Sequence, residues 1–116
     1  MTDTYDSRRN SVDTKTVQAN RQDIQVLDVR EDEEWTAGRI DGAVHIPLGE
    51  LDRRVRELDP NCPIVTVCRS GGRAGKAAEF LSGAGLNAEV MDGGMTQWAK
   101  DKLPFTTPDG RPGDLA

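Results

Sequence analysis

The chain has 116 residues, a formal net charge of −5 at pH 7 and 35% hydrophobic residues. This length predicts one domain, with a core large enough to fold without disulfides or a metal. The acidic balance argues against nucleic-acid binding, and no apolar run approaches the roughly 18 residues that cross a bilayer. Residues 1–10 are polar and lack the apolar stretch of a secretory signal, so we expect a cytoplasmic protein without a membrane partner.

Short runs of branched apolar residues alternate with helical patterns along the chain. After the polar residues 1–10, which we expect to be flexible, the segment 11–20 has a weak pattern in which Val12 or Val17 supplies an edge strand or a short helix. Strands are predicted at 24–29, 43–46, 63–67 and 88–91. Helices are predicted at 31–37 and 51–58, over the residues Ala74 to Leu81 with stop signals at Gly83 and Gly85, and in a short final segment that begins with Met95 and Trp98. Such alternation predicts an α/β fold whose parallel sheet has helices on both faces.

The two cysteines, Cys62 and Cys68, do not form a CxxC pair, and no Cys/His cluster indicates a metal site. Free thiols are typical of a reducing compartment. The predicted strand between them spans about 20 Å, far beyond the reach of a disulfide. We therefore interpret Cys62 as a bystander.

The candidate site is the stretch 65–74, a buried strand that ends at Cys68, followed by a glycine loop and the start of a helix. Gly71 and Gly72 allow successive backbone N–H groups to turn inward, as in an anion-binding nest. Unpaired N–H groups and the positive end of the helix dipole lie at the same place. A cysteine inside such a ring is expected to be at least partly thiolate near neutral pH. Cys68 is thus predicted to be a nucleophile for an anionic substrate.

Polar residues around Cys68 have functional and structural interpretations. Arg69 is predicted to rim the pocket, and Ser70 is either a hydrogen-bond donor to sulfur or an ordinary loop residue. Arg73 either binds the anionic end of the substrate or forms an ion pair with a carboxylate from a neighbouring loop. Lys76 adds to this local positive charge in an acidic chain.

Charged residues also follow the strand at 24–29. Asp28 and Arg30 are predicted to be structural, binding adjacent loops near the site. His45 is the single histidine of the chain, and we interpret it as a hydrogen-bonded, partly buried side chain rather than a general base. Trp35 and Trp98 are predicted to pack in the core or at its rim, with Trp98 as an alternative wall of the pocket.

Four motifs in order resemble the single-domain rhodaneses, a family of thiosulfate sulfurtransferase-like proteins. They are Leu27-Asp28-Val29-Arg30, Gly38-Arg39-Ile40-Asp41-Gly42-Ala43, Cys68-Arg69-Ser70-Gly71-Gly72-Arg73-Ala74 and Gly93-Gly94-Met95-Thr96-Gln97-Trp98. The resemblance implies a five-stranded, mainly parallel sheet flanked by helices. It also implies that Cys68 accepts a sulfane sulfur as a persulfide and that residues 68–73 form the active-site loop.

From this we expect a rhodanese-like domain over 11–104, a flexible tail over 105–116 ordered only where Phe105 docks, and a sulfurtransferase that uses thiosulfate or a similar donor. The carried sulfur on Cys68 is the sole expected group, with no metal or organic cofactor. The expected partner is a small sulfur-containing anion. An alternative is a relay that takes persulfide sulfur from a partner protein and docks donor or acceptor proteins.

Two further functions fit the sequence less well. Phosphatases that share this fold require five residues between the cysteine and the arginine of the loop, whereas four separate Cys68 from Arg73 here. The shorter ring suits one sulfur atom better than a tetrahedral phosphate. A non-catalytic interaction module is disfavoured because such a module would not need the cysteine and the glycines.

Overall fold

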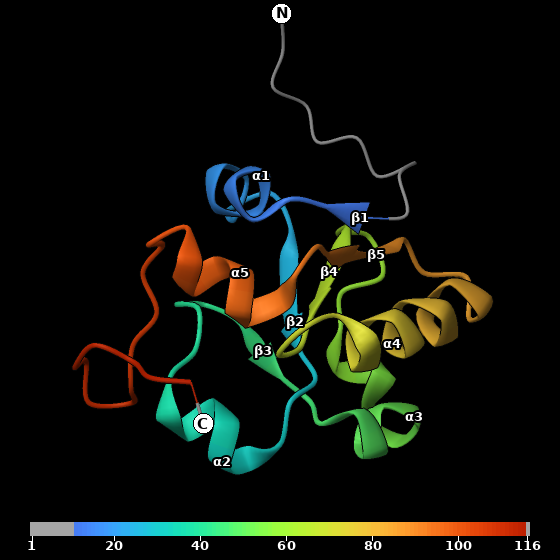
Figure 1. The fold of residues 1–116 in the computed structure, drawn as a ribbon. Helices are drawn as coiled ribbons and strands as arrows, with labels where there is room; N and C mark the ends of the chain where they lie inside the picture. The colour runs from blue at the N-terminus through green and yellow to red at the C-terminus, as the bar shows by residue number, and fades with distance from the viewer. Residues whose placement is uncertain (1–10, 116) are drawn as a thin grey trace, which may run out of the picture.

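A five-stranded parallel sheet forms the middle layer of the structure (Figure 1). The computed structural model describes residues 11–115, and the strands follow the order β1-β5-β4-β2-β3. Their bounds are Ser11–Val12 for β1, Gln25–Asp28 for β2, Val44–His45 for β3, Ile64–Val67 for β4 and Ala88–Met91 for β5. All four pairings are parallel. The predicted α/β class with a five-stranded sheet is confirmed.

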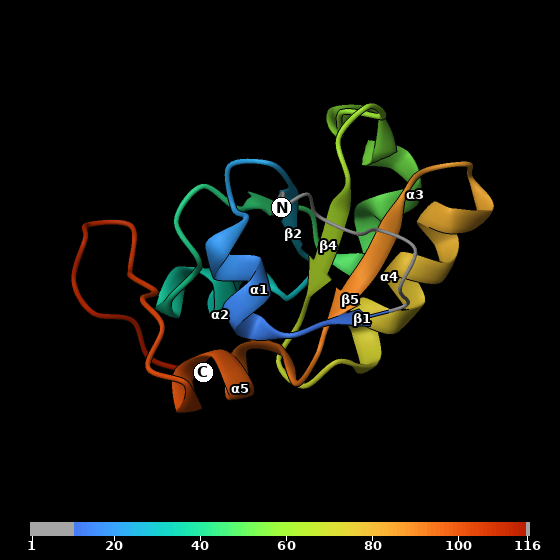
Figure 2. The same ribbon diagram turned by 90° about the horizontal axis from the view of Figure 1, so that it is seen from above.

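Helices cover both faces of this sheet (Figure 2). One face carries α1 and α5, with α2 beside them, and the other face carries α3 and α4. The helices span Thr14–Ala19 (α1), Asp32–Ala37 (α2), Leu51–Arg54 (α3), Gly72–Gly83 (α4) and Gly94–Lys100 (α5). Short 3-10 turns at Leu48–Glu50 and Val55–Glu57 flank α3. None of these described helices has the length and apolar character needed to cross a membrane.

Two apolar clusters hold the layers together, one on each side of the sheet. The first packs Val17 of α1 and Trp98 of α5 against Val65 and Val67 of β4. The second packs Ala77 and Leu81 of α4 against alternate residues of the same sheet, among them Leu27 and Ile64. Alanines on the inner face of α4 let this helix lie close to the strands, as their helical spacing predicts.

The sheet has a topological switch point between β2 and β4. The chain leaves β2 toward β3 on one side and leaves β4 toward β5 on the other, although β2 and β4 are neighbours. In open α/β sheets, the crevice at the carboxyl ends of such strands is where ligands bind. Asp28 ends β2 and Cys68 follows β4, so this crevice contains residues singled out from the sequence.

Some predicted elements differ in detail. The weak pattern at 11–20 forms both a two-residue edge strand and a short helix, with Val12 in the strand and Val17 in the helix. The predicted helix at 51–58 is wrong in its length, because α3 ends at Arg54 and continues as a 3-10 turn. The predicted flexible residues 1–10 lie outside the described residues, as does residue 116.

The C-terminal segment folds back onto α2. Thr106 pairs in antiparallel fashion with Arg39 and with Pro112, and the Asp114 amide donates to the Ala37 carbonyl at 2.9 Å. Phe105 packs against the first apolar cluster, as expected of a docking residue. The segment 105–115 therefore has more contacts with the domain than the single one that the sequence analysis assigned to it.

Candidate functional site

The sulfur of Cys68 lies within a ring of backbone amides at the start of α4. The Gly71 amide donates to Sγ at 3.0 Å, and the Ala74 amide donates to it at 3.3 Å. The side chain is buried and touches the second apolar cluster, with 1% of the residue exposed. Apolar packing thus surrounds the thiol on one side, while two N–H dipoles favour negative charge on the sulfur from the other.

Glycine is required for the bend of the loop. Gly71 precedes the first residue of α4 and has φ +122°, a conformation that side chains strongly disfavour. A Cβ built at Gly71 meets no atom within 4 Å, so the requirement concerns the backbone angle and not the available space. The sharp turn brings the Gly71 amide back toward the residue three positions earlier.

A second helix end holds the loop from its other side. The Met95 amide donates to the Cys68 carbonyl at 2.8 Å, and the Thr96 amide donates to the Arg69 carbonyl at 2.9 Å. A Cβ on Gly94 would lie 2.4 Å from the Cys68 carbonyl oxygen, and the φ of Gly94 is +58°. The first turn of α5 can therefore approach the loop only because residue 94 is glycine.

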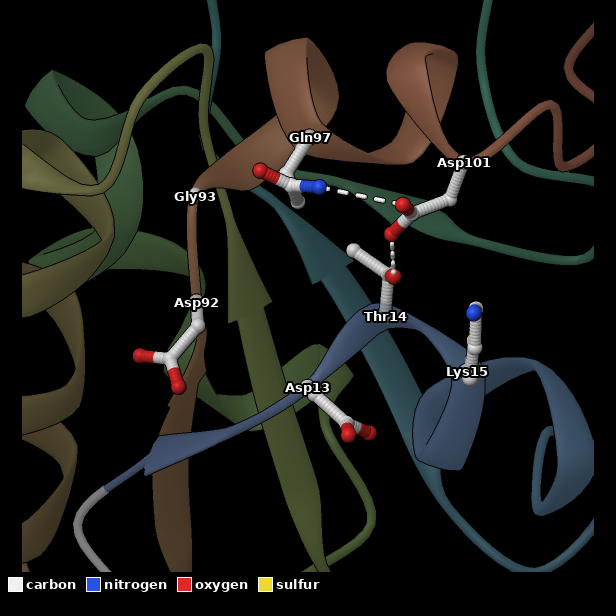
Figure 3. A pocket seen from close by; sticks show the side chains of 7 residues that line it. All are labelled: Asp13, Thr14, Lys15, Asp92, Gly93, Gln97 and Asp101. Carbon is white, nitrogen blue, oxygen red and sulfur yellow. Dashed lines mark hydrogen bonds between the residues drawn. The ribbon is translucent and has the colours of Figure 1, made fainter.

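A polar pocket beside α5 links this helix to α1 (Figure 3). The Thr14 hydroxyl donates to the Asp101 carboxylate, and the Gln97 side-chain amide donates to the same carboxylate at 3.0 Å. These hydrogen bonds, that of Thr14 first, lower the pKa of Asp101. They stabilise the position of α5, and through it the loop that carries Cys68.

Arg73 makes a two-point ion pair with Glu34 of α2. Its two terminal nitrogens lie 2.6 Å and 3.0 Å from the two carboxylate oxygens. The hydrogen bond from Arg73 lowers the pKa of Glu34 to about 2 despite partial burial, and the pKa of Arg73 is raised in return. Of the two interpretations of Arg73, the structure contains the ion pair, with a carboxylate from a helix instead of a loop.

Asp28 and Arg30 form a buried pair at the end of β2. Arg30 donates to both carboxylate oxygens of Asp28, with the closest contact at 2.7 Å, and also to the Gly38 carbonyl at 2.7 Å. Each of the two residues is 1% exposed. The pair ties the end of β2 to the chain after α2, which is the geometry that a structural role requires.

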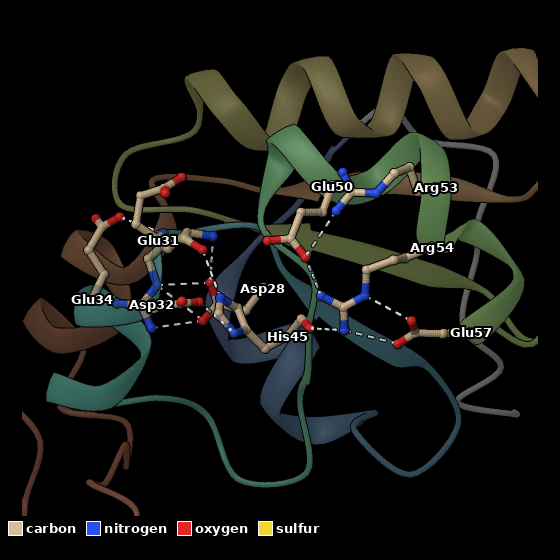
Figure 4. A network of polar contacts seen from close by, with 10 residues as sticks. Asp28, Glu31, Asp32, Glu34, His45, Glu50, Arg53, Arg54 and Glu57 are labelled. Atoms are coloured by element: carbon tan, nitrogen blue, oxygen red, sulfur yellow. Dashed lines mark hydrogen bonds and ion pairs between the residues drawn. The ribbon is translucent and has the colours of Figure 1, made fainter.

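His45 lies next to this pair (Figure 4). Its Nε2 is 2.8 Å from the Arg30 carbonyl oxygen, and its ring stacks on Trp35 with centroids 4.6 Å apart. The Arg39 guanidinium in turn lies over the Trp35 ring, 4.7 Å from its centroid. His45 is thus hydrogen-bonded and stacked, and none of its contacts involves Cys68.

The other predicted residues take several positions. Arg69 and Ser70 are exposed, which suits the rim of a pocket, and Lys76 is exposed on α4. Trp98 is fully buried and donates to the Pro104 carbonyl at 3.0 Å, so it belongs to the core. Cys62 precedes β4 at the opposite end of the strand from Cys68, and both thiols are free.

Sequence reasoning missed three contributors to the loop. Ala74 supplies an amide to sulfur, Glu34 binds Arg73, and the first turn of α5 binds two loop carbonyls. The paired glycines before Met95 were a signal for the last contact. Nothing in the local sequence distinguished Glu34 from its acidic neighbours in α2. Among residues 11–115, no group of three or more His, Cys, Asp or Glu side chains has a metal-binding arrangement.

Comparison with known proteins identifies the family. The rhodanese-like domain profile matches residues 13–101. The chain belongs to the rhodanese-like domain family. The chain is 33% identical over 86 residues to "Thiosulfate sulfurtransferase GlpE" of Pseudomonas entomophila, a match covering 73% of this chain and 78% of that protein. It is 41% identical over 76 residues to "Putative sulfur carrier protein YrkF" of Bacillus subtilis, covering 65% of this chain and 41% of that protein.

A solved structure agrees with this rhodanese-like assignment. A rhodanese-related protein from Thermoplasma volcanium superposes with a TM-score of 0.81 at 32% sequence identity. The superposition covers 84% of this chain and 98% of that one. Family membership, together with relatives named as sulfurtransferases, supports sulfur transfer as the general chemistry of the chain.

Proposed function

We propose that this protein is a sulfurtransferase that moves a sulfane sulfur from thiosulfate or a similar donor to a thiophilic acceptor through a persulfide on Cys68. The observation that supports it is the pair of amide hydrogen bonds to the Cys68 sulfur at 3.0 Å and 3.3 Å. An ionised sulfur is the nucleophile in such chemistry, and oriented N–H groups stabilise it without reorganisation.

The first half-reaction is an attack by the Cys68 thiolate on the outer sulfur of thiosulfate. The new S–S bond to Cys68 forms as the bond between the two sulfur atoms of thiosulfate breaks, and sulfite leaves with the electron pair. In the second half-reaction, cyanide or a thiolate attacks the outer sulfur of the persulfide and regenerates the Cys68 thiolate. The same N–H groups of the loop face negative sulfur in both halves.

This mechanism assigns roles to the rest of the loop. Gly71 and Gly72 provide the bend, while Arg69 and Ser70 border the entrance. Arg73 acts through its ion pair with Glu34, as argued below. No metal or organic cofactor takes part in these steps, and the thiol needs a reducing compartment such as the cytoplasm to stay reduced.

Mass spectrometry of the intact protein tests the proposal. After incubation with thiosulfate, the protein should gain the mass of one sulfur atom, and cyanide should remove it. Peptide mapping should place the added sulfur on the peptide with Cys68 and not on Cys62. A protein that gains no sulfur, or gains it on Cys62, would contradict the assignment.

A second candidate is a protein-facing relay that uses the same cysteine. The similarity to a protein named as a sulfur carrier favours it, although this chain covers 41% of that protein. A relay would show a high KM for thiosulfate and rapid sulfur exchange with a persulfidated partner such as a cysteine desulfurase. If sulfur transfer from the partner is no faster than sulfur transfer from thiosulfate, the relay is excluded in favour of the small-molecule enzyme.

Phosphatase activity is disfavoured by the size of the ring. Four residues separate Cys68 from Arg73, and the Arg73 guanidinium is already paired with the Glu34 carboxylate. We expect no hydrolysis of a phosphotyrosine mimic.

A further inference from the structure

The ion pair between Glu34 and Arg73 affects which sulfur donors the site can bind well. Arg73 lies between Gly72, the first residue of α4, and Ala74, whose amide donates to the Cys68 sulfur. Its backbone thus belongs to the turn whose amides bind this sulfur. Within the loop it is therefore well placed to attract the negative end of a substrate.

This guanidinium already forms an ion pair with the Glu34 carboxylate. Both terminal nitrogens of Arg73 donate to Glu34, and the Glu34 side chain is only 14% exposed. The carboxylate is held in place from its own helix as well, because its Oε1 accepts the Glu31 amide at 2.9 Å in a capping box. Glu34 is thus fixed before any substrate arrives, and it stays ionised at every physiological pH because its pKa is about 2.

The pair has no net charge, and that matters more for some sulfur donors than for others. Thiosulfate carries two negative charges, one of them spread over three oxygens that need a cation or several donors. A thiol persulfide has no charged oxygens, and any charge from its ionisation lies on the sulfur that is transferred, where the Gly71 and Ala74 amides lie. Because its terminal nitrogens already donate to Glu34, Arg73 binds the oxygens of thiosulfate only weakly. The backbone amides at the Cys68 sulfur stabilise the transferred sulfur of either donor equally.

We propose that Glu34 is a specificity-determining residue, which withholds Arg73 from oxyanion donors and makes the site favour persulfides over thiosulfate. This inference rests on the proposed sulfur transfer through Cys68. With a persulfide donor, the Cys68 thiolate attacks the outer sulfur of R–S–SH, the Cys68–S–SH bond forms, and R–S⁻ leaves with the electron pair. Atoms and charge balance without any further reactant.

Substitution of Glu34 by glutamine separates this role from a structural one. Glutamine has the same shape, and it can still accept from the Glu31 amide in the capping box. It lacks the charge that neutralises Arg73. A purely structural role predicts poorer binding of every donor, whereas the specificity role predicts better binding of thiosulfate alone.

The experiment measures KM and kcat for sulfur transfer to cyanide from two donors, thiosulfate and the persulfide of 2-mercaptoethanol, which has no charge apart from its sulfur. Glu34→Gln should lower the KM for thiosulfate about tenfold, the effect of one nearby charge in a partly screened site. Its KM for the persulfide should stay within about twofold of the original protein. Adding Arg73→Gln should abolish the gain, since the freed cation is its cause.

Glu33→Gln is the matched control, since Glu33 is an exposed neighbour in the same turn of α2 and should change neither KM. Glu34→Asp, which keeps the charge but shortens the reach to Arg73, should lower the thiosulfate KM less, and it provides the test if the glutamine variant does not fold. An unchanged or raised thiosulfate KM in a folded variant would overturn this inference. Failure of the original protein to take sulfur from both donors would instead overturn the proposed function.

Discussion

The two ends of β4 each have a cysteine nearby, in opposite surroundings. Before the strand, burial raises the pKa of the Cys62 thiol, and the charges of Asp59 and Asp23 raise it further. The Cys62 sulfur lies 3.7 Å from a carbonyl oxygen, that of Asp23. After the strand, the Cys68 sulfur faces two N–H groups. Cys68 is the more buried of the two thiols, yet it has the surroundings of a nucleophile.

The difference follows from the direction of the strands. In a parallel sheet, each helix that follows a strand begins at the same edge, so unpaired N–H groups gather there. At the opposite edge, the Asp23 carbonyl and the charges of Asp59 and Asp23 lie near Cys62. Chain direction, rather than exposure, thus determines which cysteine has amide donors at its sulfur. The predictions below test this contrast, beginning with the largest effect.

Removal of each thiol gives the sharpest contrast. Cys68→Ser should reduce thiocyanate formation from thiosulfate and cyanide by more than about a thousandfold, because the nucleophile is lost. Cys62→Ser should leave the rate within about twofold, since its sulfur contacts no residue of the loop. If Cys68→Ser formed thiocyanate at nearly the rate of the unsubstituted protein, Cys68 would not be the nucleophile.

Gly94→Ala should damage the Cys68 end without touching the cysteine. The new Cβ would lie 2.4 Å from the Cys68 carbonyl oxygen, at a backbone φ of +58°. We expect the free energy of unfolding to fall by about 2–3 kcal/mol, measured by urea denaturation, and sulfur uptake to fall with it.

Gly75→Ala, inside α4, is the control for Gly94→Ala. A Cβ there meets no atom within 4 Å, and alanine favours helix over glycine, so stability should rise by up to about 1 kcal/mol. Equal stability of the two variants would mean that α5 does not constrain the loop.

Glu34→Gln should also reveal a dependence of stability on pH. The folded-state pKa of Glu34, about 2, is below its ordinary value of 4.5. A carboxyl of this kind stabilises the fold above the ordinary value, and the stabilisation is lost as the pH falls from about 4.5 toward 2. Because Arg73 is partly exposed, solvent screens part of this interaction. We therefore expect the free energy of unfolding at neutral pH to be about 2 kcal/mol higher for the unsubstituted protein than for the variant.

Urea denaturation at a series of pH values measures this dependence. The gap between the two proteins should close across the acidic window, while the gap for Glu33→Gln should stay near zero throughout. A gap that persists at about pH 2 would indicate that the charge of Glu34 is not its source.

The smallest effect is expected at the Cys62 end. Asp59→Asn should lower the pKa of the Cys62 thiol, because one of the two neighbouring charges is removed, while the larger effect of burial remains. The pH dependence of alkylation, measured in a Cys68→Ser background, would show this change. A rise in the pKa would contradict the electrostatic account.

Much of the fold was predictable because its signals are local. The strand at Ala88–Met91 matches the predicted bounds, and Gly38 and Gly83 stop helices where expected. The helix at 51–58 was predicted too long, because its apolar spacing continues through Val55 and Leu58 while the backbone tightens into a 3-10 turn. Periodicity reports which residues face the core and not which backbone hydrogen bonds they make.

The candidate site divides in the same way. The bend at Gly71 and the inward-facing amides follow from seven consecutive residues, so they could be predicted. The partner of Arg73 could not, since Glu34 is 39 positions away in sequence and resembles its acidic neighbours. The paired glycines before Met95 indicate a close backbone approach, but which segment α5 approaches depends on how two helices dock at one sheet edge.

The hold of the Met95 and Thr96 amides on the loop has a consequence for biosynthesis. Translation proceeds from the N-terminus, so the thiol of Cys68 leaves the ribosome before the residues that position its loop. A nascent chain that ends before Gly94 contains Cys68 and the two amides that donate to its sulfur, but not the second helix end. The loop around Cys68 can therefore take its described geometry only after residues 94–96 have left the ribosome.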